Sequence, residues 1–219
     1  MKAKTDKRLY KVASLIDGRV LADIGTDHGK LPVELILSGK IDKAFASDIN
    51  EGPLSQAAAL IEENSLSEKI KTVLADGISG IDLKEVSDIS ICGMGGELIS
   101  SILENSFSKE YSRINFILNP MTRDDELRRY LSGRGFFIEK EVSAIQSGRV
   151  YTVIKAKYKG TPYEKEEFWY YIGEREESPE DKRYIEKVIT RLEKQKRNPE
   201  TKAKIEKIIS DIKEKILWI

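Results

Sequence analysis

The chain has 219 residues, of which 40% are apolar and 34% are charged. This composition is typical of a globular protein and excludes disordered and collagen-like chains. Basic and acidic residues balance at 37 each, so any nucleic-acid-binding surface must come from a local patch. No run of about eighteen apolar residues occurs, and the charged N-terminus lacks the apolar core of a signal peptide. We therefore expect no membrane span and no contact with membranes.

One cysteine and one histidine limit the chemistry further. A single cysteine permits no intramolecular disulfide, which fits the reducing cytoplasm. A zinc site needs several Cys, His and carboxylate ligands close together, so we expect no metal. Nothing in the sequence indicates an obligate protein partner.

Helices and strands alternate along the first 160 residues. The spacing of apolar residues predicts a helix at 5–17, a strand at 19–24, a helix at 29–39 and a strand at 43–49. A helix at 52–65 precedes three runs rich in Ile, Val and Phe, which we predict to be strands at 69–76, 87–93 and 114–120. Helices at 95–106 and 123–135 follow the second and third of these strands. Residues 136–158 hold two β-rich runs around Ser147-Gly148, which predicts a β-hairpin.

This order of elements predicts a Rossmann-like, doubly wound α/β fold. Its seven strands would form a mostly parallel sheet with an antiparallel strand near the C-terminal edge. Because crossovers between parallel strands are right-handed, the loops that follow the strands meet along one edge, where such folds bind ligands.

A different pattern begins after Gly160. An acidic segment is followed by a basic one, and two stripes of apolar residues, at 185–192 and 205–216, recur with helical spacing. Pro199 separates the stripes and starts the second helix. We predict an antiparallel helical hairpin of the coiled-coil type, and a division of the chain into residues 1–160 and 161–219.

Basic residues gather on one face of this hairpin and near its turn. They would bind the phosphates of RNA in a salt-sensitive way, although the charged outer faces of coiled coils are often only solvated. The candidates for an RNA contact are Lys187, Arg191, Lys194, Arg197, Lys202 and Lys204.

The turn in "VLADIGTDHGKLP" (residues 20–32) carries the main functional signal. A strand ending in an acid, a glycine turn and a helix N-terminus form a nucleotide-type site, because glycine lets backbone N–H groups approach a ligand. The order Asp23-x-Gly25-x-Asp27-x-Gly29 differs from the G-x-G-x-x-G fingerprint of dinucleotide-binding proteins. Asp27 would repel a pyrophosphate by about 4 kcal/mol per charge pair at an effective dielectric constant of 20. A cationic ligand such as S-adenosylmethionine therefore suits this turn better than NAD.

Two further acids end the next two strands. Asp48 follows about twenty residues later, where an acid binds ribose hydroxyls, and Asp76 would accept a hydrogen bond from an adenine amino group. Aspartates often end strands for structural reasons alone, but three at consecutive strand ends beside a glycine turn favour a cofactor site. The predicted cofactor-binding residues are Asp23, Gly25, Asp27, His28, Gly29, Asp48, Ile49, Asp76, Gly77, Cys92, Gly93 and Met94.

These motifs resemble a known family. The segments "LADIGTDHGKLP", "ASDIN" with "GPL", "ADG", "ICGMGGELI", "LNP" and "SGRVYTVI" are similar to those of the bacterial tRNA (adenine-22-N1)-methyltransferases, and the resemblance covers nearly the whole chain, including the helical hairpin. It implies a class I methyltransferase fold, S-adenosylmethionine as methyl donor, and methylation of N1 of adenine 22 in the D-arm region of tRNA. The broader class has glycine where Asp27 stands, a departure that belongs to the family's own variant.

Such a reaction does not require a general base. N1 of adenine carries an in-plane lone pair and the sulfonium is already activated, so the methyl group can be transferred in line without a covalent intermediate. Correct positioning of the two reactants lowers the activation free energy by up to roughly 7–11 kcal/mol. Asn119 would hydrogen-bond the adenine edge, and His28 lies in the turn. These are the two candidate catalytic residues. The alternative for Asn119 is a structural role before Pro120 at the end of a strand, and for His28 it is packing or capping at the start of a helix. Cys92 is either a small wall residue or, for a pyrimidine substrate, a nucleophile.

The residues alone leave three functions open: a tRNA methyltransferase, a class I methyltransferase acting on a small metabolite or another RNA base, and a non-enzymatic RNA-binding adaptor. The basic hairpin favours the first over the second, and the intact acids at positions 23, 48 and 76 argue against the third. The charge of Asp27 disfavours a nicotinamide-dependent oxidoreductase.

Overall fold

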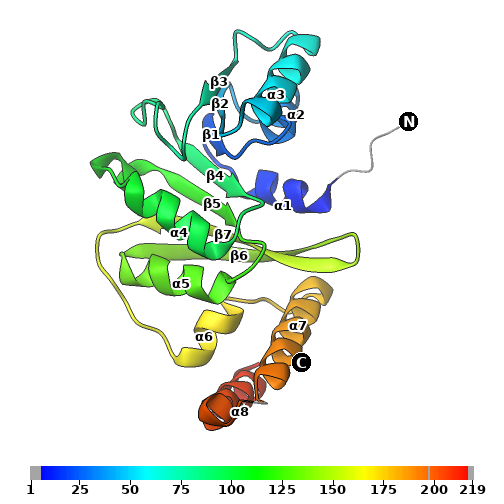
Figure 1. Ribbon diagram of the computed structural model, residues 1–219, viewed down its shortest axis with the longest axis vertical. Coiled ribbons are helices and arrows are strands. Elements are labelled where there is room, and N and C mark those ends of the chain that lie inside the picture. Colours follow the sequence, from blue (N-terminus) through cyan, green and yellow to red (C-terminus); the bar gives the residue numbers. More distant parts are fainter. Residues whose placement is uncertain (1–5, 197, 217–219) are drawn as a thin grey trace.

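A seven-stranded β-sheet runs through the protein in the order β3-β2-β1-β4-β5-β7-β6 (Figure 1). The computed structural model describes residues 6–196 and 198–216. Neighbouring strands from β3 to β5 are parallel, and β7 is antiparallel to both β5 and β6. The strands are β1 (Val20–Ile24), β2 (Lys43–Asp48), β3 (Ile70–Leu74), β4 (Asp88–Cys92), β5 (Asn115–Asn119), β6 (Phe136–Gln146) and β7 (Arg149–Tyr158). The predicted fold class, a mostly parallel Rossmann-like sheet, is confirmed.

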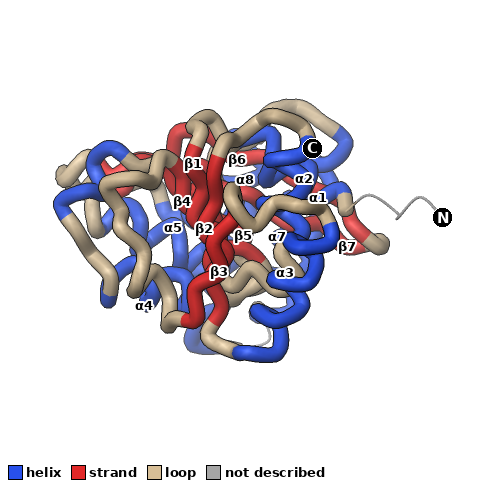
Figure 2. The backbone as a smooth tube through the Cα atoms, turned by 90° about the horizontal axis from the view of Figure 1, so that it is seen from above, coloured by secondary structure: helices blue, strands red, loops and turns tan. Residues whose placement is uncertain are grey.

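Helices cover both faces of this sheet (Figure 2). Successive residues of β1 point to opposite faces, so Leu21 packs in one buried cluster with helices α1 to α3, and Ala22 in another with α4 and α5. Within the described residues no helix is both long and apolar enough to cross a membrane. The helices of the two layers are α1 (Lys7–Leu15), α2 (Lys30–Leu37), α3 (Glu51–Glu63), α4 (Gly96–Asn105) and α5 (Asp124–Gly133), and a short 3-10 helix, η1 (Lys109–Arg113), precedes β5.

The predicted elements are found within a few residues of their expected ends. Helix α1 begins at Lys7 because the Asp6 carboxylate caps it, accepting hydrogen bonds from the N–H groups of Arg8 and Leu9. The predicted start of this helix, Thr5, lies outside the described residues. The hairpin between β6 and β7 turns at Ser147-Gly148, where both residues have positive φ angles (49° and 78°).

Helix α6 (Glu167–Ile172) is an element that the sequence pattern did not predict. Its buried residues, Phe168, Trp169, Tyr170 and Ile172, are nearly consecutive, so they show no helical period. The aromatic side chains pack in the same buried cluster as the face of the sheet that carries α4 and α5.

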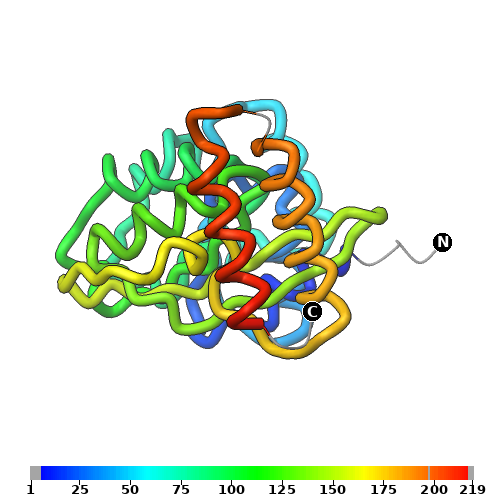
Figure 3. The backbone as a smooth tube through the Cα atoms, turned by 90° about the horizontal axis from the view of Figure 1, so that it is seen from below, coloured from blue at the N-terminus to red at the C-terminus, as the bar shows by residue number. Residues whose placement is uncertain are grey.

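Helices α7 (Pro179–Gln195) and α8 (Pro199–Lys215) lie side by side as the predicted antiparallel hairpin (Figure 3). Proline occupies the first turn of each helix, after the capping residues Ser178 and Asn198. Apolar residues of both helices, such as Ile185, belong to the same buried cluster as α4, α5 and strand β4. The hairpin therefore shares its core with the sheet, and the division of the chain at residue 160 stays a prediction.

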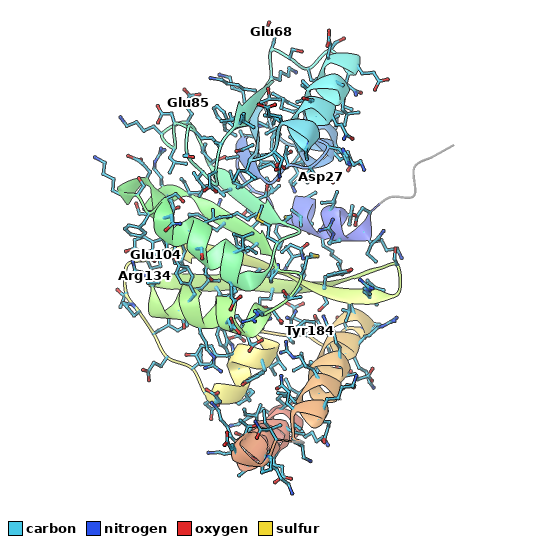
Figure 4. The ribbon with its side chains drawn as sticks, in the orientation of Figure 1. Asp27, Glu68, Glu85, Glu104, Arg134 and Tyr184 are labelled. Atoms are coloured by element: carbon cyan, nitrogen blue, oxygen red, sulfur yellow. The ribbon has the colours of Figure 1, made fainter. Side chains whose placement is uncertain are left out.

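A buried ionic network also joins α5 to β6 and α7. Arg128 is fully buried, and its guanidinium donates hydrogen bonds to Glu141 (Nη2–Oε2, 2.8 Å), to Asp124 (3.3 Å) and to the Tyr184 hydroxyl (3.0 Å). Tyr184, which lies between α7 and α5 in Figure 4, donates in turn to Asp124. Arg175 adds a second guanidinium at Glu141 (3.1 Å). Each buried charge thus faces an opposite charge, as burial requires.

Loss of Arg128 should therefore be costly. In Arg128→Met the carboxylates of Glu141 and Asp124 stay buried with fewer partners, and we expect the free energy of unfolding, measured by urea denaturation, to fall by about 3–5 kcal/mol. Arg134→Met is the matched control, because the Arg134–Glu104 ion pair is about half exposed (48% and 46%; Figure 4). That variant should lose less than about 1 kcal/mol, and equal losses in the two variants would contradict the role of the buried network.

Candidate functional site

A cavity of about 480 Å³ opens at the edge of the sheet where β1 to β4 end. Strand β1 lies between β2 and β4, so the crossovers on its two sides leave in opposite directions and open a crevice between them. Every predicted cofactor-binding residue except Gly29 lines this cavity: Asp23, Gly25, Asp27, His28, Asp48, Ile49, Asp76, Gly77, Cys92, Gly93 and Met94. The structure brings these residues together, and their contact with a cofactor stays a prediction.

The turn after β1 contains three residues with left-handed backbones. Gly25 (φ 68°) has a backbone conformation that residues with a side chain rarely adopt, and a Cβ there would lie 2.2 Å from Cε, the flexible end of Met94. Asp27 takes the same conformation (φ 54°), which aspartate adopts more readily than most residues. Gly29 (φ 69°) lets α2 approach α3, because a Cβ there would lie 3.0 Å from Cβ of Ala57. Gly25 thus lies at the cavity, whereas Gly29 allows two helices to pack closely.

Asp23 is buried under this turn with both carboxylate oxygens engaged. Thr26 donates from Oγ1 to Oδ2 at 2.7 Å, and Ser90 donates from Oγ to Oδ1 at 2.6 Å. Burial raises the pKa of Asp23 to about 6, and the two hydroxyl hydrogen bonds act against this shift. At neutral pH Asp23 therefore holds a negative charge at the base of the cavity with little help from solvent.

Asp48 and Asp76 bring two more carboxylates to the same cavity from the ends of β2 and β3. Asp48 is 8% exposed, and its Oδ1 accepts a hydrogen bond from the N–H of Asn50 at 2.9 Å. Its Oδ2 has no hydrogen bond within the part of the chain that the structure describes, so it is available to a ligand. Asp76 is exposed. Together with Asp23 and Asp27 these residues make the cavity strongly acidic.

The two candidate catalytic residues lie in different surroundings. His28 lines the cavity, and its Nε2 is 3.4 Å from Oδ1 of Asp27 (labelled in Figure 4). Asn119 is fully buried and does not line the cavity. Its Nδ2 donates to the carbonyl of Thr152 at 2.6 Å, and its Oδ1 accepts from Nη1 of Arg8 at 3.2 Å. Both polar groups of Asn119 thus have protein partners, and the catalytic roles of Asn119 and His28 stay predictions.

Cys92 ends β4 and lines the cavity without being activated. Burial raises the pKa of its thiol far above the ordinary value, the Asp23 carboxylate raises it further, and the Arg8 guanidinium opposes this to a lesser degree. A cysteine nucleophile acts as the thiolate, which needs the opposite shift. The surroundings of Cys92 favour a wall residue over a nucleophile.

Several residues that line the cavity were not predicted from the sequence. Thr26 and Lys30 lie inside the motif itself, so their position beside predicted residues was a usable signal. Arg8 gave no such signal, because α1 reaches the cavity only through its packing across the sheet. The lining residues missed are Arg8, Leu9, Ile24, Thr26, Lys30, Leu31, Asn50, Ala75, Leu98 and Ile102.

The basic residues of the helical hairpin fall into two groups. Lys194 and Lys202 are exposed and have no ion pair within the described residues, and Arg197 lies outside them. The others have partners inside the protein: Lys187 donates to the Val150 carbonyl (3.0 Å), Arg191 pairs with Asp125 (3.2 Å) and Asp124 (3.5 Å), and Lys204 pairs with Glu167 (2.8 Å). Burial also lowers the pKa of Lys187.

A model of the methyltransferase domain matches residues 5–154, which include β1 to β5 and all of the residues around the cavity. Fold and cavity together define a class I methyltransferase domain.

Comparison with individual proteins identifies the family within this class. The tRNA (adenine(22)-N(1))-methyltransferase of Bacillus subtilis (strain 168) is 36% identical over 155 residues, which are 70% of this chain and 65% of that protein, a little under two thirds of its length. A structure from Streptococcus pneumoniae, described as a putative tRNA (m1A22) methyltransferase in complex with S-adenosyl-L-methionine, is 33% identical, with a TM-score of 0.83 and coverage of 95% of this chain and 97% of that one. TrmK of M. capricolum, in complex with S-adenosyl-homocysteine, is 28% identical, with a TM-score of 0.82 and coverage of 99% and 100%. The chain belongs to the TrmK-like tRNA (adenine-22-N1)-methyltransferase family.

The buried carboxyl of Asp23 predicts a pH-dependent stability. Its pKa is about 6 in the folded protein against 3.8 for the free side chain, so its contribution is fully present below about pH 4 and is lost as pH rises through 6. Asp23→Asn cannot ionise, and its amide can still meet both hydroxyl neighbours. Between pH 4 and pH 7.5 the variant should therefore gain roughly 3 kcal/mol relative to the parent protein in urea denaturation. A difference between the two proteins that does not change with pH would contradict this account.

Proposed function

We propose that this protein transfers the methyl group of S-adenosylmethionine to N1 of adenine 22 in the D-arm region of tRNA. The observation that carries the proposal is the acidic cavity at the switch point of the sheet, lined by Asp23, Asp27, Asp48 and Asp76. A sulfonium cation with ribose hydroxyls and an adenine amino group complements these carboxylates, whereas a pyrophosphate is repelled by them. The family supplies the substrate, since the similar protein of B. subtilis is named as a methyltransferase of this tRNA position and that of S. pneumoniae is described as a putative one. A tRNA substrate also agrees with the cytoplasmic location inferred from the single cysteine.

The residues around the cavity fit this donor. A volume of about 480 Å³ lies within the usual range for cofactor sites. Because Gly25 has no side chain, only the flexible end of Met94 lies beside this part of the turn, and a ligand can displace it to reach the backbone. Asp48 would accept hydrogen bonds from the ribose hydroxyls and Asp76 one from the adenine amino group. Bound there, the donor supplies a methyl group on a positively charged sulfur.

The chain itself contributes orientation and charge to the reaction. The S–CH₃ bond breaks as the N1–CH₃ bond forms, and the positive charge passes from sulfur to the adenine ring. Because the total charge in the cavity does not change, the carboxylates of Asp23 and Asp27 stabilise the cation on both sides of the transfer. N1 attacks with its own lone pair, so no side chain has to remove a proton first, and the N6 proton leaves to water afterwards.

The loop after β4 provides space for the target base. Its residue Gly93 lines the cavity and carries no side chain, and Met121 holds the loop through a hydrogen bond from its N–H to the Met94 carbonyl at 2.8 Å. A flat ring can therefore approach the transferred methyl group between backbone atoms and small side chains. An adenine that is stacked inside tRNA has to leave its stack to reach this point.

The exposed basic residues of the helical hairpin supply the contact with tRNA. Lys194 and Lys202 are open to solvent near the turn of the hairpin. Lys187, Arg191 and Lys204 would have to exchange internal partners for phosphates, which costs part of the binding free energy. We therefore assign the larger share of the phosphate contacts to Lys194 and Lys202.

Methylation of unmodified tRNA transcripts tests the proposed function. With labelled S-adenosylmethionine we expect label on N1 of adenine 22, located by nuclease mapping, and no transfer to a transcript with guanine at that position. Label on a pyrimidine, or binding of the donor without any transfer to tRNA, would contradict the proposal.

Replacement of the cysteine separates a wall residue from a nucleophile. Cys92→Ala should keep at least about one third of kcat, because the thiol has no part in the transfer and the small cavity that it leaves costs little. Complete loss of methylation in a folded Cys92→Ala protein that still binds the donor would assign a nucleophilic role to the thiol.

Charge reversal tests whether the helical hairpin contacts tRNA. The double variant Lys194→Glu/Lys202→Glu should raise the KM for tRNA by about tenfold or more and flatten its salt dependence, with the Kd for S-adenosylmethionine unchanged. Lys213→Glu/Lys215→Glu makes the same change of charge at the opposite end of α8 and serves as the control. If both double variants raise the KM equally, the effect comes from net charge and the assignment is wrong.

A further inference from the structure

The hairpin of β6 and β7 reaches beyond the rest of the sheet (Figure 1). Strand β7 pairs with β5 only from Lys157 to Ile154, whereas it pairs with β6 as far as Arg149. We call residues 142–153, which extend past β5, the β-extension. At 3.3 Å per residue its β7 side is about 16 Å long. Because β7 is antiparallel to β5, the β-extension lies at the edge of the sheet where β4 and β5 end and the cavity opens.

Helices hold the β-extension on both of its faces. Val153 packs in the buried cluster that includes α1, and Val150 packs in the cluster that includes α7. Two hydrogen bonds from α7 secure the tip: Lys187 donates from Nζ to the Val150 carbonyl at 3.0 Å, and Arg183 donates from Nη2 to the Gly148 carbonyl at 2.6 Å. The β-extension is therefore a fixed wall beside the cavity.

The tip of this wall carries positive charge that no carboxylate neutralises. Arg149 is exposed, and within the described residues its side chain has neither an ion pair nor a hydrogen bond. Arg183 is also exposed, and its bond to Gly148 leaves other guanidinium donors free. Glu180 and Glu186 lie one turn from Arg183 on α7, but neither forms an ion pair with it in the part of the chain that the structure describes.

The basic face of α7 runs up to this tip. Arg183, Lys187 and Lys194 stand at positions i, i+4 and i+11, which a helix of 3.6 residues per turn places within about 40° of one another. They cover about 16 Å of the helix axis, at 1.5 Å per residue. Arg149 continues this stripe onto the β-extension, so a line of positive charge joins the turn of the helical hairpin to the edge of the cavity.

The order of the strands separates the methyl donor from its acceptor. Given the proposed function, the donor lies at the ends of β1 to β3, where Asp23, Asp48 and Asp76 line the cavity. The target adenine then has to enter from the side of β4 and β5, and the β-extension bounds that side. An adenine that leaves its stack keeps the phosphates on its 5′ and 3′ sides. These two phosphates therefore arrive beside the β-extension.

On these grounds we propose that Arg149 and Arg183 bind the tRNA phosphates next to the target adenine. A guanidinium forms charge-assisted, bidentate hydrogen bonds with a phosphate. The inference rests on the proposed function and adds a second contact region to it. Lys194 and Lys202 bind the tRNA away from the reacting base, whereas the β-extension positions the backbone at the site of methylation.

Footprinting of individual phosphates tests this inference. Transcripts of tRNA that carry randomly placed phosphorothioates are cleaved with iodine, with and without saturating protein, and the protected phosphates are mapped. The parent protein is compared with Arg149→Gln/Arg183→Gln and with Lys194→Glu/Lys202→Glu. Arg149→Gln is measured alone as well, because it breaks no side-chain hydrogen bond within the described residues and leaves the tip tied to α7.

The matched control is Lys157→Gln/Lys159→Gln. It also removes two positive charges, at the opposite end of β7, and neither lysine has an ion pair among the described residues. A change that this control reproduces comes from net charge and not from the β-extension.

We expect Arg149→Gln/Arg183→Gln to lose protection of the phosphates that flank nucleotide 22 and to keep the other protections. Its Kd for tRNA should rise by about 5- to 30-fold, and the slope of log K against log salt concentration should fall by roughly 1 for each lost contact. Arg149→Gln should show part of both effects. The Kd for S-adenosylmethionine should stay unchanged, and Lys194→Glu/Lys202→Glu should lose protections elsewhere in the tRNA.

Protection beside nucleotide 22 that persists in Arg149→Gln/Arg183→Gln, or that the lysine control loses to the same extent, would overturn the inference. A parent protein that protects no phosphate of tRNA would instead contradict the proposed function, and this inference with it.

Discussion

The position of β1 between β2 and β4 is the constraint on which the site depends. Parallel strands carry their C-terminal ends to one edge, and crossovers that diverge from β1 leave a crevice there which no helix fills. Short loops after β1, β2 and β3 then place Asp23, Asp48 and Asp76 around one volume, although the three residues are far apart in the sequence. The chemistry of the protein follows from which side chains these loops carry.

Charge at this edge has a cost in stability. Asp23 is buried, and its raised pKa shows that the folded protein disfavours the ionised form. Asp27 holds a left-handed backbone that glycine would adopt without strain. Both features are unfavourable for folding and useful for a cationic ligand, a combination that is common where a site is selected for binding rather than for stability.

The sequence predicted the fold well and the site in part. Apolar runs that end at turns identified all seven strands, and the same turns identified the acids of the cavity. Arg8 could not be found in this way, since its place depends on how α1 crosses the sheet. The basic stripe of α7 was visible, but spacing alone could not show that Arg191 faces Asp124 and Asp125. Residues near in sequence were predictable, and residues brought together only by packing were not.

The carboxylates around the cavity favour a sulfonium cation over a pyrophosphate. Calorimetric titration of the same protein with S-adenosylmethionine and with NADH measures this preference. We expect one S-adenosylmethionine to bind per chain in a saturable way, and NADH neither to bind in the cavity nor to displace the donor. Binding of NADH in the cavity, with no binding of S-adenosylmethionine, would contradict it.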